Sequence, residues 1–280
     1  MKIQFEPITP NLGAYVKVAA EDVLKEGIPE KIYDALNEYG VLVFPQINIA
    51  DEQLSALTSK LGTPGKLYNT AEETELTRLG IYRIALDKNN LKQLEYVIAN
   101  DYWHMDGTSY NIPGKATILK CQEAPKSGGD TGFAHLYAAY EAMPEQQKQK
   151  IANLRVIHCM EAAGRKLIAE PSADDLKRWN DAFPPTEQPL VWKQKSGRTS
   201  LIIGSTALEI AGMPREEGQA LLQELLDWCT QDQFTYRHKW QKGDLVIFNN
   251  PGLLHRSHPY NEESGRVMHR MTLEGTEAIS

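Results

Sequence analysis

Cysteine is scarce in this chain of 280 residues. Cys121, Cys159 and Cys229 are an odd number of thiols, they lie far apart, and no CxxC pair occurs among them. This pattern excludes a disulfide framework and gives no sign of a zinc ribbon. We therefore expect three buried, reduced thiols.

The sequence also lacks long apolar runs and an excess of positive charge. No stretch approaches the ~18 apolar residues of a membrane span, and the first residues lack the apolar core of a signal peptide. The formal net charge of −7 argues against broad binding to nucleic acids or anionic membranes. We therefore expect a cytoplasmic enzyme or binding protein without a nucleic-acid or membrane partner.

Short strands are the main predicted element after residue 100, with helices at the start of the chain and between strands. Pro29 and Gly40 bound one predicted helix, and a hairpin is expected around Lys242-Gly243-Asp244. The pattern indicates a mainly β protein with flanking helices, a β-sandwich or jelly roll. We expect a single domain over residues 1–280.

Two polar segments interrupt this pattern, near 63–100 and 164–187. A long irregular segment inside a compact domain is more often functional than idle. We expect both segments to act as lids that decide specificity. Tyr68, in the first of them, is a predicted substrate contact.

The stretch Tyr102-Trp103-His104-Met105-Asp106-Gly107 carries the first metal-binding signal. On an extended strand, side chains two residues apart point to the same face, so His104 and Asp106 would supply two corners of a metal site. A second histidine would complete the facial triad of non-haem Fe(II) enzymes. Alone, a His-x-Asp motif is weak.

The chain offers several histidines as the third ligand. His255 is favoured because it follows an apolar strand and the turn at 249–252, where sites are often built. His258, three residues further on, is its rival. The seven histidines are His104, His135, His158, His238, His255, His258 and His269.

Two arginines share one face of the predicted final strand. Arg266 and Arg270 would lie about 13 Å apart at ~3.3 Å per residue. Buried guanidinium groups need anionic partners, so the pair predicts a pocket for two carboxylates or similar groups. An exposed sheet face is the alternative explanation.

Taken together, these motifs make the chain similar to the taurine dioxygenase (TauD/TfdA) family of Fe(II)- and 2-oxoglutarate-dependent oxygenases over essentially its full length. The gaps agree as well as the motifs: 27 residues from His104 to Thr131, 11 from His255 to Arg266 and 15 from His255 to Arg270. The matching segments are Tyr39-Gly40-Val41-Leu42-Val43-Phe44, Leu61-Gly62, Trp103-His104-Met105-Asp106, Gly128-Gly129-Asp130-Thr131, Gly243-Asp244-Leu245-Val246-Ile247-Phe248-Asn249-Asn250, His255 and Gly265-Arg266-Val267-Met268-His269-Arg270.

The resemblance implies a double-stranded β-helix (jelly roll) with Fe(II), 2-oxoglutarate and O2 as cofactor and cosubstrates. It implies that His104, Asp106 and His255 bind the iron. Arg266, assisted by the Thr131 hydroxyl, would bind the distal carboxylate of 2-oxoglutarate. The implied substrate contacts are Arg270 and Asn100, and a homo-oligomer is an expectation from the resemblance alone. Gly107 is a further expected substrate contact, because the Gly107–Pro113 segment is expected to form part of the lid.

One departure and one distinction accompany this resemblance. The family's usual Trp-Asp-Asn-Arg before the distal histidine is Phe248-Asn249-Asn250-Pro251 here, so we expect a different placement of the loop before His255. Related halogenases have a small residue in place of the carboxylate. Asp106 therefore disfavours halogenation.

The predicted reaction is hydroxylation of an unactivated C–H bond, with release of succinate and CO2. The expected substrate is a small organic anion, either a carboxylate or a sulfonate. A free amino acid or a natural-product intermediate is the alternative substrate, with desaturation as another outcome. A cupin-type metal-binding protein without 2-oxoglutarate chemistry is the alternative from a different class.

Overall fold

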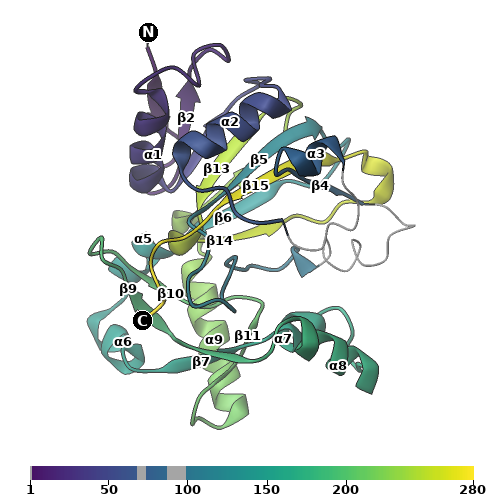
Figure 1. The fold of residues 1–280 in the computed structure, drawn as a ribbon. Helices are drawn as coiled ribbons and strands as arrows, with labels where there is room; N and C mark the ends of the chain where they lie inside the picture. The colour runs from purple at the N-terminus through teal and green to yellow at the C-terminus, as the bar shows by residue number, and fades with distance from the viewer. Residues whose placement is uncertain (1, 68–73, 87–98) are drawn as a thin grey trace.

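The computed structural model describes residues 2–67, 74–86 and 99–280 (Figure 1). Tyr68 and much of the predicted lid segment 63–100 lie outside the described residues. Two sheets face each other as in a jelly roll, and helices flank them. This confirms the predicted fold class.

The larger sheet has seven strands in the described residues, in the order β1-β2-β3-β13-β5-β15-β4. All of its pairings are antiparallel except the one between β2 and β3. The strands are β1 (Gln4–Pro7), β2 (Ala14–Lys17), β3 (Val41–Phe44), β4 (Tyr82–Ala85), β5 (Ala116–Glu123), β13 (Leu245–Asn249) and β15 (Val267–Leu273).

The facing sheet is smaller and has the order β12-β6-β14. Its strands are β6 (Thr131–His135), β12 (Thr235–His238) and β14 (Leu253–Ser257). Two further small sheets, β11-β7-β8 and β10-β9, lie with helix α9 in the lower half of Figure 1. Their strands are β7 (Arg155–His158), β8 (Thr186–Pro189), β9 (Val191–Lys193), β10 (Thr199–Leu201) and β11 (Ala207–Ile210).

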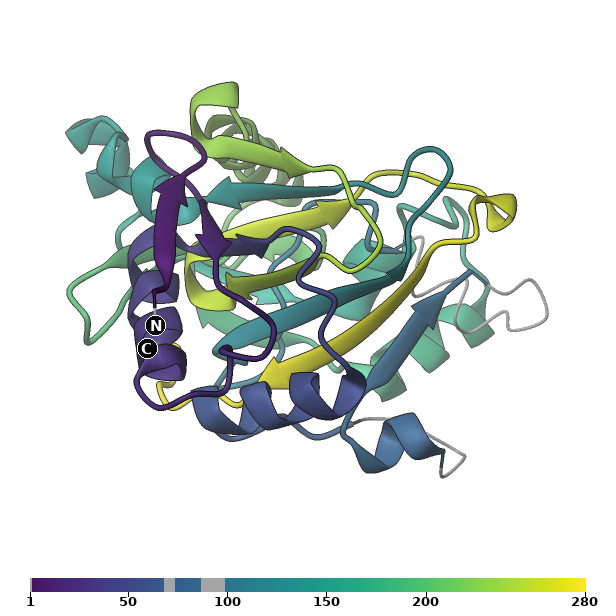
Figure 2. The ribbon, with the colours of Figure 1, turned by 90° about the horizontal axis from the view of Figure 1, so that it is seen from above.

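Helices α1 and α2 lie against the outer face of the larger sheet (Figure 2). Helix α1 has Pro29 in its first turn and ends at Gly40, whose φ of 72° favours glycine. The described helices are α1 (Ile28–Tyr39), α2 (Asp51–Leu61), α3 (Glu75–Arg78), α5 (Leu136–Glu141), α6 (Glu145–Ile151), α7 (Met160–Gly164), α8 (Ala173–Ala182) and α9 (Arg215–Cys229), with short 3-10 turns η1 (Asp232–Phe234), η2 (Asn250–Gly252) and η3 (Glu262–Ser264).

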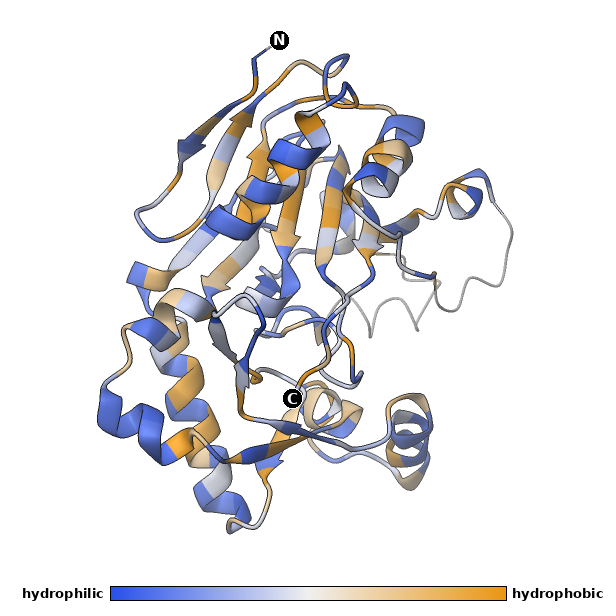
Figure 3. Ribbon diagram, turned by 60° about the vertical axis from the view of Figure 1, so that its left-hand side comes forward, coloured by the Kyte–Doolittle hydropathy of each residue, from blue (hydrophilic) through white to orange (hydrophobic). Residues whose placement is uncertain are grey.

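The central strands are apolar on both faces, and Figure 3 shows hydrophobic residues concentrated on them. In β13, Leu245 and Ile247 pack towards α1 and α2, whereas Val246 and Phe248 pack between the two sheets. Side chains alternate along a strand, so one strand supplies both cores. In β5 this alternation turns Leu119 into the space between the sheets, and Thr117 follows the same face.

The structure corrects one local expectation and confirms another. The predicted hairpin around Lys242-Gly243-Asp244 is wrong, because β12 pairs with β6 and β13 pairs with β3 and β5. The segment instead carries the chain from one sheet to the other. The three cysteines are buried and free, as expected.

Candidate metal and cosubstrate site

His104 and His255 lie side by side because their backbones pair. His104 N donates to His255 O at 3.0 Å, and His255 N donates to His104 O at 2.8 Å. Their ring centroids are 4.1 Å apart. The strand expected around His104 is therefore a single β-bridge, and His255 lies within β14 rather than beyond a strand end.

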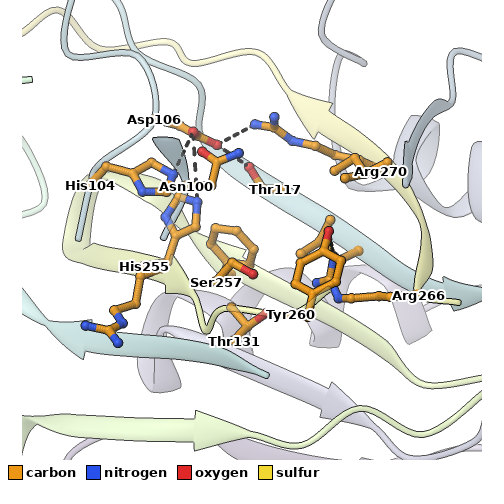
Figure 4. Close-up of a pocket in the computed structure, with 14 residues that line it drawn as sticks. Asn100, His104, Asp106, Thr117, Thr131, His255, Ser257, Tyr260, Arg266 and Arg270 are labelled. Atoms are coloured by element: carbon orange, nitrogen blue, oxygen red, sulfur yellow. Dashed lines mark hydrogen bonds and ion pairs between the residues drawn. The ribbon is translucent and has the colours of Figure 1, made fainter. Parts of the chain in front are cut away.

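Asp106 lies in the turn that follows this bridge, and its side chain points back to the two rings (Figure 4). Its Oδ1 is 3.8 Å from His104 Nε2 and 3.9 Å from His255 Nε2. One ligand atom from each residue lies within 4.8 Å of the other two. The structure therefore brings the three predicted residues together. Asp106 reaches the two imidazoles from a turn, whereas it was expected to lie with His104 on an extended strand.

Both imidazoles are prepared to act as neutral donors. His104 Nδ1 lies 2.8 Å from the Tyr102 carbonyl oxygen, which places the proton on Nδ1 and leaves the Nε2 lone pair towards Asp106. Burial lowers the pKa of His104 and lowers that of His255 further. At neutral pH both rings are neutral, so each has one unprotonated nitrogen that can bind a metal.

The second oxygen of Asp106 is occupied by hydrogen bonds. Thr117 Oγ1 donates to Asp106 Oδ2 at 3.1 Å, and an Arg270 Nη donates to the same oxygen at 2.5 Å. Burial alone would raise the pKa of Asp106, but the Arg270 charge and the Thr117 hydrogen bond hold it well below its usual range. Asp106 is therefore a carboxylate with Oδ1 directed at the imidazoles.

Thr117 is itself fixed by Asn250. The Asn250 amide nitrogen lies 3.2 Å from Thr117 Oγ1, and both side chains are almost fully buried. Asn250 belongs to the turn η2 that precedes β14, next to Pro251. The loop with the unusual proline is thus still connected to the Asp106 carboxylate through Thr117.

Arg266 lies at the other end of the same cavity. It is 6% exposed, its Nε donates to Gly129 O at 3.0 Å, and its Nη1 lies 3.4 Å from the Tyr260 hydroxyl. A side chain at Gly129 would come within 2.8 Å of Arg266 Cδ, and φ there is +69°. The glycine is needed for the arginine to reach the cavity.

The cavity joins these two ends. Thr131 lies between the cluster of His104, Asp106 and His255 and the Arg266 side chain. Ile84, Leu119 and Phe248 supply apolar walls. Its described lining residues are Ile84, Asn100, His104, Asp106, Thr117, Leu119, Thr131, Phe248, His255, Arg256, Ser257, Tyr260, Arg266 and Arg270.

The predicted substrate contacts fall into three groups. Asn100 and Arg270 line the cavity. Gly107 is absent from the described lining. Its φ is +84°, and a Cβ at this position would lie 3.1 Å from Pro113, so the glycine has a role in the turn. Tyr68 lies outside the described residues. None of the described lining residues comes from 164–187, the second predicted lid.

Sequence reasoning missed Thr117, Tyr260 and Asn250 as site residues. For Thr117 a signal existed, because it is a polar residue two positions before Leu119, on the same buried face of the apolar segment that forms β5. Tyr260 lies in a loop between β14 and β15, where no periodicity marks it. Its place beside Arg266 follows only from the tertiary structure.

The donor set suits a divalent transition metal. Two neutral imidazoles and one carboxylate on one side of a cavity match the 2-His-1-carboxylate arrangement of non-haem Fe(II) sites, which leaves coordination positions for other ligands.

No helix in the described part of the chain is long and apolar enough to cross a membrane.

Comparisons with known proteins identify relatives over most of the chain. Residues 4–272 match the family model "Taurine catabolism dioxygenase TauD, TfdA family". The chain is 30% identical to the alpha-ketoglutarate-dependent 2,4-dichlorophenoxyacetate dioxygenase of Cupriavidus pinatubonensis, covering 97% of this chain and 98% of that one. It is 28% identical to the alpha-ketoglutarate-dependent sulfate ester dioxygenase of Pseudomonas putida, covering 98% and 90%.

A solved structure is similar over the whole chain. The crystal structure of AAD-2 in complex with Mn(II) and N-oxalylglycine superimposes with a TM-score of 0.82 at 28% identity and covers 100% of both chains. These matches decide against a cupin-type protein without 2-oxoglutarate chemistry. The chain belongs to the TauD/TfdA family and is an Fe(II)- and 2-oxoglutarate-dependent dioxygenase, an oxidoreductase that uses O2 as its second cosubstrate.

Proposed function

We propose that His104, Asp106 and His255 bind the Fe(II) of this dioxygenase. The observation that supports this assignment is the convergence of His104 Nε2, His255 Nε2 and Asp106 Oδ1 on one point of the cavity. When bound, the iron supplies the centre at which O2 is reduced and a substrate C–H bond is oxidised. The protein's own contribution is to position the reactants.

Arg266 and Thr131 bind the distal carboxylate of 2-oxoglutarate in this proposal. Arg266 is buried, and its hydrogen-bond acceptors are neutral: the Gly129 carbonyl and the Tyr260 hydroxyl. Its charge also acts on the Asp101 carboxyl, but no ion pair joins the two among the described residues. A buried guanidinium without a directly paired anion is costly. A carboxylate arriving from the cavity would make a charge-assisted pair with it. Thr131 lies on the same wall and offers a hydroxyl.

The substrate is a small organic anion with an apolar body, and the aryloxyalkanoic acids are the class we favour. Arg270 lies on the cavity wall beside Asp106, so an anionic group near the iron would find a cation there. Ile84, Leu119 and Phe248 would pack against an apolar body. Relatives named for 2,4-dichlorophenoxyacetate and (S)-phenoxypropionate support this class.

A second substrate class is a sulfate ester or sulfonate. The relative named for sulfate esters covers nearly the whole chain, and a guanidinium binds a sulfo group with the same fork geometry as a carboxylate. The two classes differ in the shape and charge distribution of the anionic group. A direct comparison of substrates therefore distinguishes them.

The test is a panel of aryloxyalkanoates, alkyl sulfates, sulfonates and free amino acids, each incubated with the protein, Fe(II), ascorbate and 2-oxoglutarate. Succinate and oxidised product are both quantified. We expect succinate formation to be stimulated most by an aryloxyalkanoate, with one product formed per succinate. Stimulation only by sulfur oxyanions would favour the second class, and stimulation only by amino acids would overturn the proposed substrate.

A further inference from the structure

The Thr131 hydroxyl is held by a buried tryptophan that lies outside the cavity. Trp240 Nε1 donates to Thr131 Oγ1 at 2.9 Å, and the two residues are 6% and 3% exposed. We propose that Trp240 is a positioning residue that aims the Thr131 hydroxyl proton at the distal carboxylate of 2-oxoglutarate. The proposal rests on the cosubstrate site proposed above and adds a residue that never touches the ligand.

The argument starts from the hydrogen-bonding capacity of the two groups. An indole N–H can only donate, whereas a threonine hydroxyl has one proton to donate and two lone pairs to accept with. The Trp240 N–H therefore uses one lone pair and cannot receive the hydroxyl proton. No described residue accepts that proton. Thr131 lines the cavity, so the proton remains available to a ligand bound there.

The tryptophan is well placed to act as a fixed donor. His238 and Thr131 are register partners in the β12–β6 pair, and Trp240 follows His238 by two residues. The His238 ring packs edge-on against the indole at 4.6 Å and 88°. His238 is in turn tied to the buried Asp244 carboxylate, with Nε2 to Oδ2 at 3.0 Å.

Apolar packing completes the arrangement. Trp240 belongs to the core between the two sheets, together with Phe133 and Val246. A side chain fixed on both its polar and its apolar sides holds its N–H in one direction. The hydroxyl of Thr131 thus needs no reorientation when a carboxylate arrives, which is the condition for a strong hydrogen bond to a charged group.

The expected consequence is a specific loss of affinity for ligands that carry a distal carboxylate. Without the indole N–H, the hydroxyl proton can rotate among several directions, and part of the binding energy is spent on orienting it. Because Trp240 acts through Thr131, its effect requires the Thr131 hydroxyl. This dependence separates a positioning role from a general structural one.

The test is calorimetric binding of 2-oxoglutarate to the Mn(II)-loaded protein, which measures affinity without turnover. We expect Trp240→Phe to weaken binding by roughly threefold to tenfold and Thr131→Val by roughly tenfold or more. The double variant should bind no more weakly than Thr131→Val. Trp228→Phe is the matched control, because it removes a partly buried indole hydrogen bond of 2.8 Å to Ala139 O, and neither residue lines the cavity.

Oxalate provides the second readout, since it can chelate the metal but has no distal carboxylate. Trp240→Phe should bind oxalate as the wild type does, and equal weakening for both ligands would overturn the proposal. Additive effects in the double variant would also overturn it. If Trp240→Phe does not fold, the benzothienyl analogue of tryptophan at position 240 removes the N–H while keeping the ring system.

The outcomes also distinguish this inference from the proposed site. If Arg266→Ala and Thr131→Val bind 2-oxoglutarate as tightly as the wild type does, the cosubstrate assignment itself is wrong. If those two variants bind weakly and Trp240→Phe binds normally, the assignment stands and only the role of Trp240 is overturned.

Discussion

Arg270 donates a hydrogen bond to Asp106 Oδ2, while Oδ1 of the same carboxylate lies nearest the two imidazoles. One arginine therefore touches a proposed iron ligand and lines the proposed substrate cavity. An anion that binds Arg270 changes the surroundings of Asp106, so substrate binding and the metal centre share a side chain.

Replacing this arginine should therefore affect two properties at once. We expect Arg270→Leu to weaken Mn(II) binding by about tenfold, because groups that orient a metal ligand typically contribute tenfold to 100-fold in affinity. It should also raise the KM of an anionic substrate. Metal titration in the absence of substrate isolates the first effect, and an unchanged metal affinity would leave Arg270 with a substrate role alone.

The Thr117 hydroxyl holds the same oxygen and can be removed with little change of volume. Thr117→Val should lower metal affinity by about tenfold, since Asp106 loses one of two hydrogen bonds that orient it. Thr117→Ser keeps a hydroxyl and is the matched control. Equal metal affinity in the Val and Ser variants would show that this hydrogen bond does not orient Asp106.

Metal and a cosubstrate analogue should stabilise the folded protein. A ligand at 100 times its Kd raises the free energy of unfolding by about 2.7 kcal/mol if it binds only the native state. Thermal unfolding with Mn(II) and N-oxalylglycine should show this increase, and a chelator should reverse it. Asp106→Ala should show no increase; a full increase in that variant would contradict its assignment as a ligand.

The stability of the protein should depend on pH through a histidine that does not line the cavity. His158 is fully buried between the Thr206 hydroxyl and the Ile202 carbonyl, and burial lowers its pKa to about 4. Between pH 6.5 and 4 the unfolded chain binds a proton that the native ring does not. The free energy of unfolding therefore falls as pH falls, by about 3 kcal/mol for this group.

Other groups titrate in the same interval, so the comparison must be between variants. Burial lowers the pKa of His135 to about 4 and raises that of Asp101 to about 6, and these two shifts oppose each other. His158→Gln leaves both in place. Denaturant unfolding from pH 7 to 4 should show a flatter profile for His158→Gln, and parallel profiles would exclude this role for His158.

Much of the fold could be predicted because the strands carry strong local signals. Apolar runs such as Val41–Phe44 and Leu245–Asn249 have a length and composition that favour buried strands, and both are strands. Their partners could not be predicted from such patterns. The wrong hairpin at Lys242-Gly243-Asp244 reflects this, because a turn signal does not say whether the chain returns to the same sheet.

For the site as well, residues in local motifs could be predicted, whereas contacts between distant segments could not. The His-x-Asp motif and the family resemblance identified the residues that converge, but not the single β-bridge that brings the two histidines together. That bridge joins positions 151 residues apart and has no local signature. Thr117, Asn250 and Trp240 were missed because each acts through a neighbour in space and not through a motif: Thr117 through Asp106, Asn250 through Thr117, and Trp240 through Thr131.

The most direct test of the proposed iron site is the amount of Fe(II) bound per chain, measured by anaerobic equilibrium dialysis. His255→Ala is compared with His258→Ala, which removes the rival histidine three residues away. We predict one Fe(II) for the wild type and for His258→Ala, and a loss of tight binding for His255→Ala. Wild-type iron binding by His255→Ala, or its loss in His258→Ala, would contradict the assignment.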